Sequence, residues 1–210
     1  MSQYLLDLIA MGEHQQLDFK FEINDARKIA RTLVAFSNTD GGKILIGVKD
    51  NGKIAGVRSE EEYYMIETAA TIFCKPEIKF QLKKWEIQGK TVLEVDIPKG
   101  TNRPYRSKNE DDRWMSYVRV NDQNFLANSI QIRVWKNEKR KKGIYLKFTE
   151  KEKILLDYLQ KNPISLAQYC KISGLNRKKA SDILVRFISL GVVKMNYSEK
   201  EISYSVTNKL

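Results

Sequence analysis

Several side chains at the start of one predicted helix have the chemistry to bind nucleic acid. They lie in the segment NRKKASDILVRFISLG, residues 176–191. The candidates are Asn176, Arg177, Lys178, Lys179, Ser181 and Arg186. Amide, guanidinium, ammonium and hydroxyl groups donate to phosphate oxygens and to the acceptors on purine edges. We therefore expect the start of this helix to contact the major groove of a duplex, with Arg186 touching the backbone two turns further on.

One acid in the same helix does not fit this interpretation. Asp182 would repel phosphate unless it accepts a hydrogen bond from a cytosine amine. The alternative is that this part of the chain docks on another protein and not on nucleic acid.

The elements around this helix predict a winged helix over residues 148–210. Residues 148–163 and 165–175 predict two helices, and the helix over 176–191 follows them. Residues 192–208 predict two short strands around a polar tip. Helix, helix–turn–helix and hairpin is the order of elements in a winged helix. The stripe that the third helix is expected to bury consists of Ala180, Ile183, Leu184, Phe187 and Ile188.

Positive charge is concentrated in the last third of the chain. The net charge is zero over residues 1–130, +6 over 131–147 and +5 over 148–210, which accounts for the +11 of the whole chain. Because each neutralised phosphate releases counterions, such a local surplus suits a polyanion. A basic linker over 136–147 is expected to touch phosphates, and a merely solvated tether is the alternative. Its candidate residues are Lys139, Arg140, Lys141 and Lys142.

The composition excludes several other classes of protein. With 42% hydrophobic and 30% charged residues, the chain resembles an ordinary globular protein. No apolar run is long enough to span a membrane, and the N-terminus lacks the features of a signal peptide, so we expect a cytoplasmic protein with no membrane partner. Cys74 and Cys170 are expected to stay unpaired. His14 is the only histidine, so any metal would need carboxylate ligands and would be magnesium, manganese or calcium.

Residues 1–135 predict a mixed α+β domain, with hairpin-connected strands and helices packed against them. Residues 2–11 and 59–74 predict helices. Asn24 is the expected cap of another helix that runs up to a pair of glycines. Residues 124–135 predict a last helix that leads into the linker.

Two hairpins are expected in this domain. In residues 43–57, two apolar runs flank the Asn-Gly dipeptide at 51–52, which is the preferred centre of a type I′ turn. Residues 77–98 predict a second hairpin, with its turn at 88–89. Strands paired in this way account for most of the predicted sheet.

Several motifs of the first domain are specific enough to compare with a known family. The most specific is AFSNTDGGKILIGVKDNG at residues 35–52, preceded by Gly12-Glu13 and by LDFK at 17–20. Together they resemble the Schlafen-type AlbA domain. The resemblance spans about residues 10–130. It implies a DNA-binding domain that is often joined to a C-terminal winged helix in bacterial transcriptional regulators. Looser matches are VDIP at 95–98, RPY at 103–105 and YVRV at 117–120.

The same resemblance implies a metal-dependent nuclease as an alternative. In some animal Schlafens the domain is an RNA endonuclease with an E-x4-E-F-K motif and a later aspartate. Glu13, Asp18 and Lys20 keep that spacing, with Asp in place of the second Glu, and Asp50 is the candidate for the third carboxylate. Clustered carboxylates would hold magnesium or manganese, which activates water. Because Asp50 is fully explained by its turn, we expect carboxylates that are splayed apart or neutralised by Lys20, and no nuclease activity.

An ATP-hydrolysing site is not expected. The segment TDGGK at 39–43 lacks the four-residue spacer of a P-loop and the Ser or Thr that follows its lysine. It also follows a predicted helix, whereas a P-loop follows a strand.

Taken together, the sequence predicts an α+β protein in three parts. These are a Schlafen AlbA-like domain over 1–135, a basic linker over 136–147 and a winged helix over 148–210. The expected partner is double-stranded DNA, contacted by a transcriptional regulator without a cofactor. RNA in place of DNA and a homodimer in place of a monomer stay open as alternatives.

Overall fold

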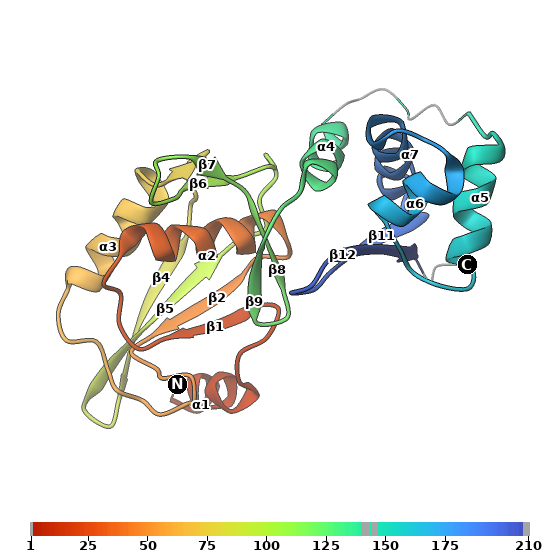
Figure 1. The fold of residues 1–210 in the computed structure, drawn as a ribbon. Helices are drawn as coiled ribbons and strands as arrows, with labels where there is room; N and C mark the ends of the chain where they lie inside the picture. The colour runs from red at the N-terminus through yellow and green to blue at the C-terminus, as the bar shows by residue number, and fades with distance from the viewer. Residues whose placement is uncertain (1, 140–142, 144–146, 208–210) are drawn as a thin grey trace. The chain divides into compact units, whose positions relative to one another are not determined.

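The computed structural model describes residues 2–139, 143 and 147–207, and the chain divides into two compact units (Figure 1). Unit 1 is Met1–Ala127 and unit 2 is Asn128–Leu210. The division falls before the boundary expected after residue 135. The reason is that helix α4 (Ser129–Glu138) packs against helix α7 (Arg177–Ser189) and so belongs to unit 2.

Unit 1 is built on a four-stranded mixed sheet in the order β1-β2-β5-β4. The strands are β1 (Leu17–Lys20), β2 (Gly42–Ile46), β4 (Gln81–Ile87) and β5 (Lys90–Ile97). β1 is parallel to β2, and the other pairs are antiparallel. The expected hairpin of β4 and β5 is present, and its turn residues Gln88 and Gly89 both have positive φ, at 53° and 71°.

The other expected hairpin forms only in part. The turn is present, because the amide of Gly52 donates to the carbonyl of Lys49 at 2.7 Å. Beyond it, a single bridge joins Val48 and Ile54, and residues 53–57 form no second strand of the hairpin. β1 and β5 already occupy both edges of β2, so no edge is left for a further strand.

Alternate residues of the sheet pack on its two faces. Ile44 and Ile46 join helices α2 (Ala26–Asn38) and α3 (Glu61–Thr71) in one core, whereas Leu45 joins helix α1 (Ser2–Met11) in another. Figure 1 shows α2 and α3 over one face of the sheet and α1 on the other. The period of two along a strand explains this division.

Helix α2 begins one residue later than expected. Its cap is Asp25 and not Asn24, since Asp25 Oδ1 accepts from the amides of Arg27 and Lys28 at 2.8 and 3.4 Å. Both residue types can cap a helix, and the chain geometry selects the second.

Two smaller sheets complete unit 1. One contains β3 (Cys74–Lys75), β6 (Arg106–Lys108) and β7 (Trp114–Met115). The other is the hairpin of β8 (Tyr117–Val120) and β9 (Gln123–Leu126), which packs against α2. β9 occupies the start of the segment predicted to be a helix, and α4 begins only after its cap Asn128, which accepts from the amide of Gln131 at 2.9 Å.

Unit 2 contains the helices and the hairpin in the predicted order. Beside α4 and α7 it has α5 (Glu150–Leu159) and α6 (Leu166–Ser173), and a three-stranded sheet in the order β10-β12-β11. Its strands are β10 (Ile164–Ser165), β11 (Val193–Tyr197) and β12 (Ile202–Val206). The predicted stripe of α7 is confirmed: Ala180, Ile183, Leu184 and Phe187 are buried, and Ile188 packs partly buried against them.

Cys74 and Cys170 are both free thiols, as expected. Among the described helices, none has the length and apolarity that a membrane crossing requires.

Candidate nucleic-acid interface

The first turn of α7 presents three cations to solvent. α6 ends at Gly174, whose φ of 66° lets the chain reverse before α7 begins. Asn176 then caps α7, since its Oδ1 accepts from the amide of Lys179 at 2.9 Å. Arg177, Lys178 and Lys179 follow the cap and are exposed. The positive end of the helix dipole adds to their charge, so this turn favours an anion.

The charges of this turn are not used inside the protein. Among the described residues, no carboxylate lies within ion-pair distance of Arg177, Lys178 or Lys179. A free surface cation retains its full attraction for phosphate, less what salt screens. The three side chains are therefore available to a ligand.

Two of the candidates further along α7 are placed differently from the expectation. Ser181 is buried, with 8% of its surface exposed. The guanidinium of Arg186 donates to Oε1 of Glu152 at 3.2 Å, and the Glu152 side chain is 4% exposed. Since Arg186 neutralises a buried acid of α5, it supports the fold of unit 2. The exposed donors of α7 are thus confined to its first turn.

Asp182, the acid that did not fit, has a partner within unit 2. Its carboxylate pairs with the guanidinium of Arg133 on α4. No contact to a base is needed to account for it. This pair could not be predicted from the sequence, because Arg133 lies in a segment that was expected to belong to the first domain.

The basic linker is described only at its start. Lys139 is the C-cap of α4 and is exposed. Arg140, Lys141 and Lys142 lie outside the described residues.

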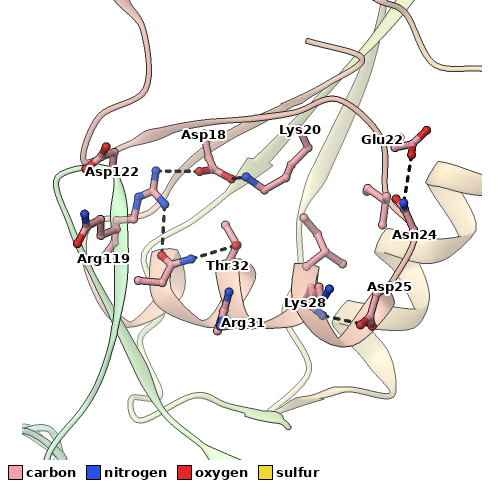
Figure 2. Close-up of a pocket in the computed structure, with 14 residues that line it drawn as sticks. Asp18, Lys20, Glu22, Asn24, Asp25, Lys28, Arg31, Thr32, Arg119 and Asp122 are labelled. Atoms are coloured by element: carbon pink, nitrogen blue, oxygen red, sulfur yellow. Dashed lines mark hydrogen bonds and ion pairs between the residues drawn. The ribbon is translucent and has the colours of Figure 1, made fainter. Parts of the chain in front are cut away.

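The carboxylates proposed for a nuclease lie in unit 1. Asp18 is buried, with 3% of its surface exposed. Arg119 Nη2 donates to its Oδ1 at 2.9 Å, and Lys20 Nζ lies 2.5 Å from its Oδ2. Asp18 lines a cavity of about 600 Å³, and Figure 2 shows its carboxylate between these two cations. Both Arg119 and Lys20 therefore neutralise the charge of Asp18. The pairing with Lys20 was expected from the sequence.

Arg119 is the residue of this site that sequence reasoning missed. It is 2% exposed and lies over the ring of Phe36 at 5.1 Å. Its Nη1 donates to Asn124, whose amide in turn donates to Thr32. In the sequence it stood only within the YVRV motif, where nothing indicated that it is buried.

Glu13 lies near Asp18, but Asp50 does not complete a metal site with them. Burial raises the pKa of Glu13, and the negative charge of Asp18 adds to this increase, while a hydrogen bond from the Phe19 amide at 2.8 Å opposes it. Asp50 is exposed in the turn after β2. Within the described ranges, no group of three or more His, Cys, Asp and Glu side chains is arranged to hold a metal ion. The geometry thus gives the Glu13, Asp18 and Asp50 hypothesis no support.

Comparisons with known proteins identify a family and two similar solved structures. Residues 13–128 match the Schlafen AlbA_2 family. No curated protein matches the sequence significantly. Similar solved structures include the DIP2311 protein from Corynebacterium diphtheriae, with 19% identity and a TM-score of 0.45 over 59% of this chain and 28% of that chain. Another is the N-terminal domain of a RecG-related protein from Nitrosomonas europaea, with 19% identity and a TM-score of 0.40 over 56% of this chain and 86% of that chain. Because the family match covers more than half of the 210 residues, the chain belongs to the Schlafen AlbA_2 family.

Proposed function

We propose that this protein binds double-stranded DNA through unit 2, that unit 2 is a winged helix, and that the protein regulates transcription. The observation that carries the proposal is the first turn of α7, where Arg177, Lys178 and Lys179 are exposed and without acidic partners. α6 and α7 form the helix–turn–helix, and β11 and β12 form the wing. In this arrangement α7 contacts the major groove at its N-terminal turn.

The distribution of charge supports the proposal. Residues 1–130 carry no net charge, whereas residues 131–210 carry the whole surplus of +11. The attraction for phosphate is therefore expected in unit 2, which includes the linker. Families with an AlbA_2 domain are often related to nucleic acids, which is consistent with a DNA-binding role for the whole chain.

In this proposal the basic linker contacts only the sugar–phosphate backbone of the DNA. Phosphate contacts fix position without reading sequence. Replacing Lys139, Arg140, Lys141 and Lys142 by alanine should therefore lower the affinity for every duplex alike and flatten its dependence on salt. A tether that makes no contact would leave the salt dependence unchanged.

The central experiment measures duplex affinity by fluorescence anisotropy at several salt concentrations. With each good contact contributing about 1–3 kcal/mol, the variant R177A/K178A/K179A should bind at least about a hundredfold more weakly than the wild type. The matched control is K53A/K75A/K83A, which removes three exposed lysines from unit 1. An equal loss in both variants, or none in the first, would contradict the proposal.

Two further arms of the same assay test the alternatives. A structured RNA in place of the duplex measures the preference for DNA. Incubation with manganese tests for cleavage, and we expect both nucleic acids to remain intact because Asp18 is paired with Arg119 and Lys20.

A further inference from the structure

Asp182 pairs with a residue of another helix although two lysines of its own helix are closer in sequence. Lys178 and Lys179 precede it by four and three positions, the spacings at which oppositely charged side chains pair on a helix. In the structure its partner is Arg133 of α4. Neither lysine is paired with any carboxylate of the described residues.

The three residues lie along one strip of α7. Its core side faces the inside of unit 2 through Ala180, Ile183 and Leu184. Lys178 and Lys179 precede these core residues, Asp182 lies among them in sequence, and none of the three is buried. An unpaired carboxylate at position 182 would thus lie within one turn of the two lysines that are proposed to bind phosphate.

The packing of helix α4 on α7 fixes the position of Arg133, the partner of Asp182. Ile130 and Val134 of α4 belong to the buried core that includes α7. Arg133 lies between them in sequence, at the edge of this contact, and reaches Asp182. The position of the arginine is therefore set by the packing of its helix.

Stability alone does not account for the pair. Both side chains are 42% exposed. Ion pairs with this exposure contribute little to the free energy of unfolding, because water and salt screen them and two long side chains lose freedom. The pair therefore contributes little to the fold, which leaves room for a role at the surface.

We propose that Arg133 forms an ion pair with Asp182 and thereby prevents Asp182 from pairing with Lys178 or Lys179, so that both lysines can bind phosphate. Arg133 is a positioning residue in this scheme, and α4 becomes part of the nucleic-acid-binding unit. The inference rests on the proposed function, since it concerns the same turn of α7. Without Arg133, Asp182 loses its counterion and pairs with one of the lysines, so one positive charge fewer is available to the bound phosphate.

The experiment compares Arg133→Ala with Lys136→Ala by duplex affinity. Lys136 is an exposed cation on the same helix, so both variants lose one positive charge, but only the first releases Asp182. We expect a loss on the order of tenfold for Arg133→Ala and on the order of twofold for Lys136→Ala. Adding Asp182→Asn should restore the affinity of Arg133→Ala to that of the wild type. Arg133→Lys, which keeps a cation opposite Asp182, should bind nearly as well as the wild type.

A double-mutant cycle separates this mechanism from a simple sum of charges. If Arg133 acts through Asp182, the gain from Asp182→Asn is larger in the Arg133→Ala background than in the Lys136→Ala background. Equal losses in the two single variants, with equal gains from Asp182→Asn, would overturn the inference while the proposed function stands.

A second measurement needs no DNA. In the full chain, NMR of the lysine side chains should show new pairing of Lys178 or Lys179 with Asp182 in Arg133→Ala, but not in Lys136→Ala. Unchanged lysine signals in Arg133→Ala would overturn the inference, whether or not the protein binds DNA. Failure of the wild type to bind a duplex would overturn the proposed function, and the NMR result would still test the inference. Circular dichroism of each variant confirms that unit 2 is folded.

Discussion

The two units each contain an aspartate that pairs with an arginine, and the two pairs differ in almost every respect except their chemistry. In unit 1 the side chains of Arg119 and Asp18 are 1% and 4% exposed. In unit 2 those of Arg133 and Asp182 are both 42% exposed. The first pair lies in a wall of buried polar groups, and the second lies on the surface beside unpaired cations.

The difference in exposure determines what each pair can do. Removing one partner of a buried pair leaves the other charge without water or a counterion, which costs far more than the loss of a screened pair. The buried Arg119–Asp18 pair therefore has a structural role in unit 1. The exposed pair adjusts the charge that unit 2 presents to a ligand. Similar residue types in the sequence can thus indicate either a structural role or a binding role.

Breaking the buried pair should have the largest effect on stability. Asp18→Asn leaves the guanidinium of Arg119 buried without its counterion, so the free energy of unfolding should fall by about 3–5 kcal/mol. Urea denaturation of the full chain measures this loss, with hydrogen exchange of the β1 and β2 amides to assign it to unit 1. The matched change Asp182→Asn should lower it by less than about 1 kcal/mol. Equal effects of the two substitutions would show that burial does not separate the two pairs.

A cation of α7 should show the opposite behaviour. Lys178→Ala should weaken duplex binding and reduce the slope of log affinity against log salt by about one, because one phosphate contact is lost. The free energy of unfolding should change by no more than about 0.5 kcal/mol, since the side chain is exposed and unpaired. Anisotropy titrations at several salt concentrations and a urea curve measure the two effects. A stability loss without a change in slope would assign the lysine to the fold.

The cap of α7 connects the two kinds of effect. Asn176→Ala removes the acceptor for the Lys179 amide, which should lower the stability of unit 2 by about 1 kcal/mol. Asn176→Asp keeps an acceptor and should stay close to the wild type in stability, while its added negative charge weakens DNA binding. Thermal unfolding together with anisotropy distinguishes the two variants. If Asn176→Ala were as stable as the wild type, the cap would not determine where the first turn begins.

The local signals of unit 2 made its elements predictable. Gly174 ends one helix, Asn176 starts the next, and the apolar period of α7 gives its buried face. These signals act over a few residues, so they can be recognised in a single sequence. The exposed cations of the first turn could be predicted for the same reason.

The ion pairs could not be predicted in this way. Arg119 and Asp18 are 101 positions apart, and Arg133 and Asp182 are 49 apart. Only the tertiary fold brings such residues together, and their types alone do not reveal it. The division of the chain falls before α4 for a related reason, since α4 is grouped with unit 2 by its packing on α7.

Glu13 offers the smallest test of the comparison, through the pH dependence of stability. Burial raises its pKa above the ordinary value of 4.5, and the nearby charge of Asp18 adds to the increase. In the pH range between these two values, the folded protein binds a proton that the unfolded chain has released. The free energy of unfolding should therefore fall as the pH rises from 4.5 through the raised pKa, and should become constant with respect to this group above it. Glu13→Gln cannot ionise, so it should lack this fall and gain stability relative to the wild type as the pH increases.

Urea denaturation at a series of pH values measures this difference. Glu77→Gln removes one exposed carboxylate from the same unit and corrects for the change in net charge. If Glu13→Gln instead lost stability relative to the wild type with rising pH, the hydrogen bond from the Phe19 amide and the charge of Lys20 would outweigh burial. Glu13 would then be held as an ionised carboxylate beside Asp18, which stays paired with Arg119 and Lys20. That result would show that hydrogen bonding and nearby cations, and not burial, determine the ionisation of Glu13, and exposure would no longer be enough to explain how the charged groups of the two units differ.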